Sequence, residues 1–441
     1  MIFKLFIILS IKLGDFFFKY SIYRNIKKWS DINKMSKDEL NELQRKNFTK
    51  FLNNSIKRVP FYKELNVKME GDPYVDIKKF PIMTKSSLRK NEDDLISKDF
   101  DKNNLLASYS SGSSGIQSRV FMSKPERSSN WGILLNIWKL QGYEFGNPII
   151  QTGITPDRSK LKFLKDFLFR TSYVNAFSHS ETELKKILLK NKNNKNTVII
   201  GYASSLNVMA EIVLKEQLKI KVKSVISFGD KLFDKYKKNI NKAFNTDVKE
   251  SYGSNEGLMI AFQKDLDYLY IINPHVYVEI LDDHNNPVLD GEMGNIVVTR
   301  LDCFSMPLIR YKIGDLGIKL PLDEYPKKRK YNYPLLKQVV GRETDIIVLP
   351  NKTKMVVHSF TGIFEYIPEI KQFKVIQEDL KGITIEYIKS DTFSESTLKK
   401  VLTELRKYIN TNEFNITFKE VNYIAPTKSG KPQIIESRLK K

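Results

Sequence analysis

Between residues 196 and 253 the sequence alternates short apolar runs with longer amphipathic stretches. The runs NTVIIGY (196–202), KSVISFG (223–229) and DVKESYG (247–253) are typical of strands. The stretches between them, SSLNVMAEIVLKE (204–216) and LFDKYKKNINKAF (232–244), carry apolar residues at helical spacing. This alternation predicts a parallel α/β sheet, in which the loops at the carboxyl ends of the strands bind ligands.

Two further parts follow this region. VYVEIL (276–281) and NIVVTRL (295–301) flank a turn-rich stretch and predict a β-rich subdomain. Beyond Gly341, the predicted strands ITIEYI and ITFKEV enclose a helix, which indicates a small α+β unit. The apolar stripe of that helix consists of Leu398, Val401, Leu402, Leu405 and Ile409.

With 441 residues, the chain is expected to form more than one domain. We expect an α/β fold with a large domain at 58–343, which holds the parallel sheet and the β-rich subdomain. A small α+β domain is expected at 344–441, with the boundary near Thr344, and a helical segment at 1–57. An extended RVPFY stretch (58–62) should follow that segment.

Composition narrows the classes of protein. The net charge of +22 allows nucleic-acid binding, but the lysines are spread along the chain without a recognition motif, which favours a solvated basic surface. Cys303 is the single cysteine, so no intrachain disulfide can form, which suits a reducing cytoplasm. The four histidines lack metal-ligand spacing, so no structural zinc site is expected.

The first twenty residues, MIFKLFIILSIKLGDFFFKY, are apolar but interrupted by Lys4, Lys12 and Asp15. The uninterrupted run is too short for a spanning helix, and no small-residue cleavage site follows it. A helix here can lie on a membrane surface or pack on the main domain, and packing is the favoured alternative. Its apolar positions are Phe6, Ile7, Ile11 and Leu13.

Five motifs carry candidate chemistry. YSSGSSG (109–115) offers backbone amides and hydroxyls to phosphate oxygens, although a Ser/Gly run is more often a flexible loop. SYGSNEG (251–257) places an aromatic ring that can stack on a purine beside a carboxylate that can hold magnesium; the alternative is a plain turn. In PLIRYKIGDLG (307–317), Asp315 in a turn between strands can accept from ribose hydroxyls. Arg310 can orient a phosphate or a loop, or form an ordinary ion pair.

The last two motifs are shorter. GRETD (341–345) places Arg342 and Asp345 at the expected boundary. PTKSGKPQ (426–433) places Lys431 on a glycine-containing loop, where the alternative is a frayed basic tail. Each motif alone is a modest signal, so their order along the chain is what indicates function.

In this order, the five motifs resemble those of the adenylate-forming superfamily of acyl-CoA synthetases, adenylation domains and luciferases. The chain is most similar to the phenylacetate–coenzyme A ligase branch and its CapK-like relatives of capsular polysaccharide biosynthesis. RVPFYKEL (58–65) and FPIMTKSSLRKN (80–91) also resemble that branch, so the likeness runs from about Arg58 to the end.

The resemblance implies a role for each matching residue. Asp315 matches the ribose-binding aspartate, Glu256 the magnesium ligand, and Thr344 the hinge of a mobile C-terminal lid domain. Lys431 matches the lysine that catalyses adenylation, and Arg342 the arginine near the hinge. The residues that match the binding loop for the β- and γ-phosphates of ATP are Ser110, Ser111, Gly112, Ser113, Ser114 and Gly115. Those that match the adenine-binding positions are Gly229, Asp230, Tyr252 and Gly253.

The implied enzyme is an adenylate-forming ligase. It would use ATP and magnesium to convert a carboxylic acid into an acyl-adenylate, releasing pyrophosphate, and then pass the acyl group to coenzyme A or to an amine. The capsule-related likeness suggests a sugar precursor as acceptor, in the cytoplasm or at the inner face of the membrane. Members of the family are often dimers. The alternatives are a non-catalytic nucleotide-binding relative and, less favoured, a basic nucleic-acid-binding protein without specific recognition motifs.

Some positions depart from the family pattern. Ser113, Ser114 and Gln117 replace the common threonines and lysine of the phosphate loop, and serine keeps the hydroxyl. The stretch LPNKTKMVV (349–357), after the hinge at Thr344, replaces one that in relatives is glycine-rich and shapes the second half-reaction. The sequence therefore leaves the acceptor open between a thiol and an amine. Residues between Tyr202 and Gly257, Phe228 among them, are expected to line the acid pocket.

Overall fold

The computed structural model describes most of the chain, in two compact units. The larger unit comprises Met1–Ile313 and Ile318–Gln338, and the smaller unit Gly314–Gly317 and Val339–Lys441. The predicted phosphate loop (110–115), Gln117, Thr344, Asp345 and Lys431 lie outside the described residues. Those residues are 2–109, 118–153, 160–176, 181–342, 346–350, 354–356, 360, 363–364, 367, 369–407, 409, 414–425 and 433–439.

The main sheet has eleven strands in the order β10-β11-β12-β13-β9-β8-β7-β6-β5-β3-β4. Its parallel half consists of β3 (Ile149–Gly153), β4 (Thr171–Asn175), β5 (Val198–Tyr202), β6 (Ser224–Phe228) and β7 (Val248–Ser254). The predicted alternation between residues 196 and 253 is therefore confirmed, and with it the α/β fold class.

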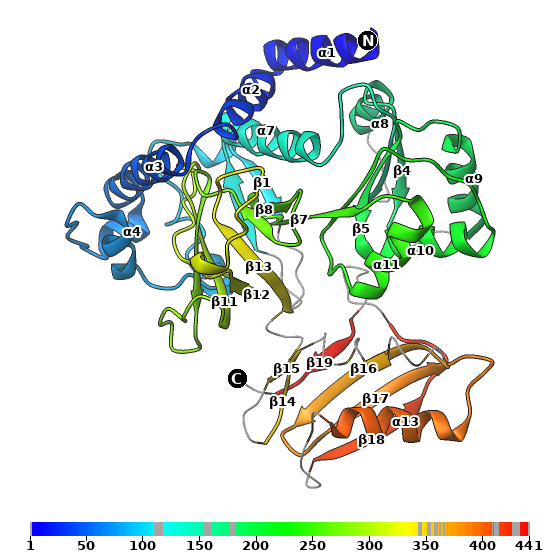
Figure 1. Cartoon of the computed structure of the whole chain (residues 1–441). Coiled ribbons are helices and arrows are strands. Elements are labelled where there is room, and N and C mark those ends of the chain that lie inside the picture. Colours follow the sequence, from blue (N-terminus) through cyan, green and yellow to red (C-terminus); the bar gives the residue numbers. More distant parts are fainter. Residues whose placement is uncertain are drawn as a thin grey trace. The chain divides into compact units, whose positions relative to one another are not determined.

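Helices cover both faces of the parallel strands (Figure 1). One face packs against α9 (Glu181–Asn191), α10 (Ala203–Lys215) and α11 (Asp234–Phe244). The other face packs against α1 (Ile2–Phe18), α2 (Ile22–Ile32) and α7 (Lys124–Leu140). Successive side chains of a strand point to opposite faces, so Ile199 joins the first core while Val198 and Ile200 join the second.

The β-rich half of the sheet is largely antiparallel. Val278 of β10 lies opposite Val298 of β11, which confirms the two strands predicted around the turn-rich stretch. A separate hairpin pairs β1 with β2. The strands of these parts are β1 (Leu106–Tyr109), β2 (Arg119–Met122), β8 (Leu258–Gln263), β9 (Leu269–Ile271), β10 (Val276–Leu281), β11 (Met293–Arg300), β12 (Tyr311–Lys319) and β13 (Leu335–Arg342).

The N-terminal region is helical, and one local expectation there is wrong. The long helix α3 (Lys37–Arg58) begins at a capping box formed by Ser36 and Glu39. The RVPFY stretch, expected to be extended, instead forms the short helix α4 (Pro60–Glu64). Pro60 occupies the first helical turn, where its fixed φ and missing N–H suit a helix start. The remaining short elements are α5 (Pro73–Asp76), η1 (Ile77–Lys79), α6 (Lys85–Lys90), η2 (Lys102–Asn104), α8 (Lys160–Leu168) and η3 (Leu322–Glu324).

The smaller unit contains a four-stranded sheet in the order β18-β17-β16-β19. Helix α13 (Glu395–Arg406) is the crossover between the parallel strands β17 and β18, as the apolar stripe predicted. The hairpin of β14 and β15 completes the unit. The strands are β14 (Ile346–Val348), β15 (Lys354–Val356), β16 (Ile370–Asp379), β17 (Gly382–Lys389), β18 (Asn415–Glu420) and β19 (Ile435–Ser437).

One side chain joins the hairpin to this sheet. The amide of Gln377, on β16 and fully buried, accepts from the Val348 N–H at 2.9 Å and donates to the Val348 carbonyl at 2.8 Å. A leucine of similar size at this position would leave two backbone groups of β14 without their partner. Buried groups left unpaired are costly because water cannot replace the lost bond.

We therefore predict that Gln377→Leu lowers the free energy of unfolding of the smaller unit by about 2 kcal/mol. Urea denaturation measures the loss, and hydrogen exchange should show faster exchange at the Val348 amide. Gln372→Leu is the matched control, because Gln372 lies exposed on the same strand. Equal stability of the two variants would contradict the prediction.

Candidate active site

The carboxyl ends of β6 and β7 bring two predicted adenine-binding segments together. Phe228 lies opposite Ser251 in the parallel register, so Gly229 and Tyr252 follow side by side. Gly229 has φ +83°, and a Cβ there would lie 2.6 Å from the Tyr202 ring, so the close approach requires glycine. The Tyr202 and Phe228 rings lie 5.1 Å apart between centroids. The sheet edge thus presents an aromatic surface next to a backbone turn.

Asp230 binds the start of a neighbouring helix at this edge of the sheet. Its carboxylate accepts from the backbone N–H groups of Ala203 (2.5 Å) and Ser204 (3.1 Å) and from the Ser204 hydroxyl (2.6 Å). These groups begin α10, so Asp230 caps that helix from the neighbouring strand end. This bond fixes the 229–230 turn against the helix. A contact of Asp230 with adenine remains a prediction from the resemblance.

Glu256 lies in the turn that joins β7 to β8. The residue is buried, and the hydroxyl of Tyr311 donates to its Oε1 at 2.9 Å. Gly253 and Gly257 make the turn possible: a Cβ on Gly253 would lie 2.4 Å from the Leu258 carbonyl, and Gly257 has φ +84°. The sequence thus holds one carboxylate in a fixed place at the strand ends.

The donor set at this turn fits magnesium in one specific way. No group of three or more potential ligands occurs among the residues that the structure describes, and Glu256 supplies a single carboxylate. Mg²⁺ bound together with a nucleotide needs only one or two protein carboxylates, because phosphates and water fill its remaining positions. Glu256 is therefore compatible with a nucleotide-bound Mg²⁺.

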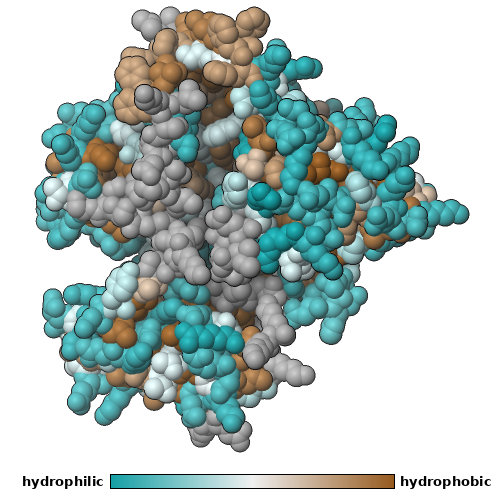
Figure 2. Space-filling view, turned by 180° about the vertical axis from the view of Figure 1, so that it is seen from behind, coloured by the Kyte–Doolittle hydropathy of each residue, from teal (hydrophilic) through white to brown (hydrophobic). Residues whose placement is uncertain are grey.

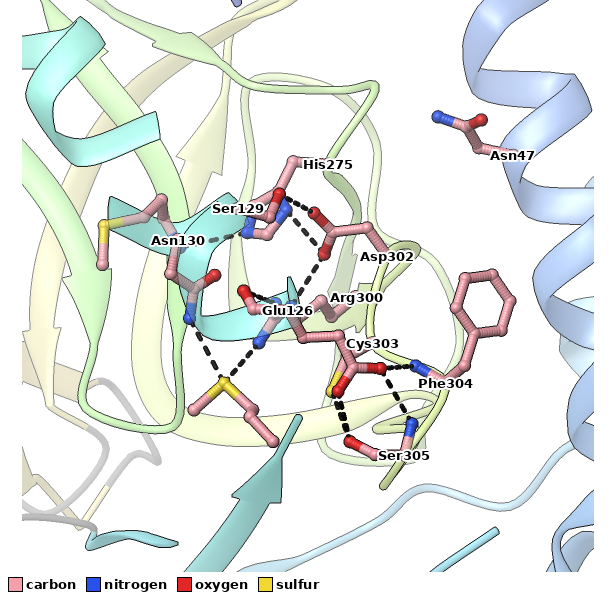
Figure 3. Close-up of polar contacts among 12 residues, drawn as sticks. Asn47, Glu126, Ser129, Asn130, His275, Arg300, Asp302, Cys303, Phe304 and Ser305 are labelled. Carbon is pink, nitrogen blue, oxygen red and sulfur yellow. Dashed lines mark hydrogen bonds and ion pairs between the residues drawn. The ribbon is translucent and has the colours of Figure 1, made fainter. Parts of the chain in front are cut away.

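A buried polar network supports the Glu256 turn (Figure 3). Arg300, the last residue of β11, donates from Nε to Asp302 at 2.8 Å and from Nη1 to the Met122 sulfur at 3.0 Å. A Cβ on Gly257 would lie 2.8 Å from Arg300 Nη1. The guanidinium therefore packs directly against the turn, and only glycine leaves room for it.

His275 extends this network to the next strand. Its Nδ1 lies 3.0 Å from Asp302, and its Nε2 accepts from the Met259 N–H at 3.4 Å, just beyond the turn. The Ser129 hydroxyl also donates to Asp302, at 2.9 Å. Burial alone would raise the pKa of Asp302, but His275 and Arg300 outweigh it and hold that pKa well below its usual range. Asp302 is thus a stable anion among buried donors.

Glu126 connects the same region to α7. Its carboxylate accepts from the backbone N–H groups of Phe304 (2.6 Å) and Ser305 (2.9 Å), and from the Ser123 N–H that precedes the helix (2.7 Å). The intervening Cys303 is buried, and burial raises the pKa of its thiol to about 12. The segment that follows β11 is therefore fixed to the start of α7.

Arg310 has no free guanidinium to offer a phosphate. It is buried, donates to both oxygens of Glu279 at 2.9 and 3.1 Å, and donates to the Phe80 carbonyl at 3.2 Å. Its φ of +49° is unusual for a residue other than glycine. Of the alternatives raised by the sequence, orientation of a loop is the one this geometry supports, because the Phe80 segment is held by Arg310.

Two predicted site residues belong to the smaller unit. Asp315 lies within β12 and not in a turn between strands, so that local expectation is wrong; β12 runs unbroken from Tyr311 to Lys319. Arg342 is the last residue of the adjacent strand β13 and is half-buried. Their roles toward ribose and the hinge remain predictions, as do those of the phosphate loop (110–115), Thr344 and Lys431.

Sequence reasoning missed Tyr311 and the Arg300–Asp302–His275 network. Tyr311 lies inside the PLIRYKIGDLG motif, four residues before Asp315, so its place in that motif was a usable signal. His275 was considered only for metal spacing, and its contacts with Asp302 and Met259 depend on the fold. Nothing local in the sequence indicates that these three residues meet beneath the Glu256 turn.

Comparisons with known proteins agree with this fold. The CapK C-terminal domain family matches residues 347–438. Protein CapK of Staphylococcus aureus is 26% identical over 436 residues, covering 95% of this chain and 92% of CapK. A phenylacetate-coenzyme A ligase of Pseudomonas putida is 27% identical over 194 residues, 40% of this chain and 42% of that protein. Among solved structures, the chain aligns with 2-hydroxyisobutyryl-CoA ligase in the postadenylation state, in complex with R3-HIB-AMP, with a TM-score of 0.72. The alignment covers 92% of this chain and 91% of that one, at 14% sequence identity.

The chain has the fold of a solved acid–CoA ligase, and these likenesses support the resemblance to the adenylate-forming superfamily. Within it, the chain is similar to CapK over nearly its whole length and to phenylacetate–coenzyme A ligases over part of it. The resemblance drawn from the five ordered motifs is thereby confirmed.

The buried network leads to a stability prediction. Asp302→Asn removes the anion while Arg300 stays buried, so the free energy of unfolding should fall by about 3 kcal/mol at neutral pH. Because the folded-state pKa of Asp302 is lowered, its contribution is fully present above about pH 4 and declines as the pH falls below that value. The difference between wild type and variant should shrink accordingly.

Urea denaturation at several pH values measures both effects. Asp323→Asn is the control, because Asp323 is exposed on η3. Adding Arg300→Met to Asp302→Asn should recover part of the loss, since no buried charge then lacks its partner. A pH-independent difference would show that Asp302 acts through shape alone.

Proposed function

We propose that the chain is an ATP- and magnesium-dependent ligase that activates a carboxylic acid as an acyl-adenylate. It then transfers the acyl group to coenzyme A or to an amine. The observation that carries this proposal is the juxtaposition of Gly229 with Tyr252 at adjacent strand ends, with Glu256 held in the turn directly beyond. The likeness to acid–CoA ligases and to an amide bond synthetase supports the reaction class.

The first half-reaction is the attack of a substrate carboxylate oxygen on the α-phosphorus of ATP. A new P–O bond forms, the bond to pyrophosphate breaks, and no proton needs to move because the acid is already ionised. Negative charge accumulates on the phosphates, and a fixed, partly desolvated cation stabilises it. The resemblance assigns that cation to Lys431, with the hydroxyls and amides of residues 110–115 holding the β- and γ-phosphates.

The remaining residues position the nucleotide. Tyr252 would stack on adenine, with the Gly229–Asp230 turn on its other side, and Asp315 would accept from the ribose hydroxyls. Glu256, oriented by the Tyr311 hydroxyl, would hold Mg²⁺, which neutralises phosphate charge when bound. The Arg300 network keeps the turn in place by filling the space beneath Gly257.

The second half-reaction uses the acyl-adenylate as an activated ester. The acceptor nucleophile forms a bond to the acyl carbon, and AMP leaves with the bonding electron pair. The likeness to a coenzyme A ligase supports a thiol acceptor. The resemblance to CapK-like relatives of capsular polysaccharide biosynthesis suggests the alternative, an amine on a sugar precursor. A cytoplasmic location at the inner face of the membrane would suit that pathway.

The first test measures acid-dependent exchange of labelled pyrophosphate into ATP across a panel of aryl, fatty, amino and sugar acids. One acid class should support exchange, and Lys431→Ala should reduce it by on the order of 10²–10³. Lys428→Ala, in the same PTKSGKPQ segment, is the control and should retain activity. Binding of ATP without exchange by any acid would favour a non-catalytic nucleotide-binding protein. Failure to bind ATP or AMP would contradict the proposal.

A second test addresses the magnesium site. Tyr311→Phe removes the hydroxyl that orients Glu256, so the Mg²⁺ concentration for half-maximal exchange should rise on the order of tenfold. Glu256→Gln should raise it further, because the ligand loses its charge. Tyr331→Phe is the control for a buried tyrosine elsewhere in the larger unit. An unchanged magnesium dependence in both site variants would remove Glu256 from this role.

A further inference from the structure

Helix α1 packs on the larger unit by one side only. Ile7 and Ile11 are buried in the core beneath the parallel strands, whereas Leu9, Leu13 and Phe16 recur on the opposite side at helical spacing. Phe16 and its neighbour Phe17 are 79% and 71% exposed. Figure 2 shows apolar side chains gathered over this helix, at the top of the view.

A second helix, next to the start of α1, also exposes phenylalanines. On α8, Phe163 and Phe167 are 70% and 73% exposed. The end of α8 lies next to the start of α1. The Arg170 guanidinium is 4.4 Å from the centre of the Phe3 ring, and Phe169 packs into the core that contains Ile7. We define the apolar face as the exposed side chains of Leu9, Leu13, Phe16, Phe17, Phe163 and Phe167.

Hydrogen bonds from two side chains hold helix α1 in place. The Asp15 carboxylate accepts from the N–H groups of Ile22 (2.9 Å) and Tyr23 (2.8 Å), which fixes the junction of α1 with α2. The Arg170 guanidinium also donates to the Gly146 carbonyl at 3.0 Å, beside the start of α1. The face is therefore presented by a helix docked on the domain, and its phenylalanines are not needed to hold that helix.

Charge indicates what covers the apolar face. Residues 1–30 contain six basic residues and one acid, Asp15, whose carboxylate is already used at the start of α2. On α8, Lys162 and Lys165 flank the phenylalanines, and Asp166 is buried. A second copy of the chain would bring like charges together, which disfavours association. An anionic lipid surface instead offers phosphates to the lysines and an acyl boundary to the phenylalanines.

We propose that the apolar face of α1 and α8 docks the protein in the plane of an anionic lipid bilayer. Among the described residues, no helix has both the length and the apolar character required to cross a membrane, so the contact is peripheral. The proposal is independent of the ligase reaction, since none of these residues belongs to the candidate active site. It fixes which side of the larger unit meets the lipid.

The test is co-sedimentation of the full-length protein with vesicles of phosphatidylcholine alone or mixed with phosphatidylglycerol. Binding should require the anionic lipid and weaken with salt. Phe16→Ser/Phe17→Ser and Phe163→Ser/Phe167→Ser should each lower the partition constant at least about tenfold, because binding scales with buried apolar area. Lys162→Glu/Lys165→Glu should also reduce binding without changing the apolar face.

Leu289→Ser/Leu322→Ser is the matched control, because these leucines are 74% and 63% exposed elsewhere on the larger unit. Circular dichroism and pyrophosphate exchange establish that each variant is folded. Absence of vesicle binding by the wild type would overturn the proposal, as would binding that the phenylalanine variants leave unchanged. Sedimentation velocity provides the last outcome: a dimer abolished by the same variants would show that a second copy covers the face.

Discussion

The ion pair of the buried Arg300 with the partly exposed Asp302 is the interaction on which the candidate site depends. Moving the Arg300 charge out of water is costly, and the cost is offset because each charge has several partners. Asp302 receives contacts from Arg300, His275 and Ser129, and Arg300 also packs against Met122 and the Gly257 turn. Strands β8 and β11 and helix α7 therefore meet around one pair of charges. The turn that presents Glu256 rests on this arrangement.

The local patterns of the sequence predicted the parts of the fold that depend on periodicity. Buried runs between residues 196 and 253 became β5, β6 and β7, and the stripe through Val401 and Leu405 became α13. The predictions that were wrong concern the local backbone conformation of two short segments. The RVPFY stretch was predicted to be extended, whereas Pro60 at the first turn of a helix favours helical φ. Asp315 was predicted to lie in a turn between strands, yet β12 continues through it.

The candidate site was predictable only as far as its motifs extend. Tyr252, Glu256 and the Gly229–Asp230 turn were proposed for the site from the family resemblance, and their roles stay predictions. The supporting contacts were not, because they depend on the fold: Glu126 meets Ser305 from 179 positions away, and Tyr202 contacts the Gly229 turn only after β5 and β6 pair. The exposure of the α8 phenylalanines could likewise not be predicted from the sequence, since an apolar residue on an amphipathic helix is ordinarily buried.

The single thiol of the chain has a practical consequence. Cys303 is buried beside the Glu126 carboxylate, and its raised pKa keeps it protonated and poorly nucleophilic at neutral pH. The natural protein is therefore already a nearly unreactive background for thiol chemistry. Cysteines introduced at one exposed position in each unit would react selectively with a pair of fluorescent dyes. Energy transfer between the dyes would then report changes in the separation of the two units, and Cys303 would not have to be removed first.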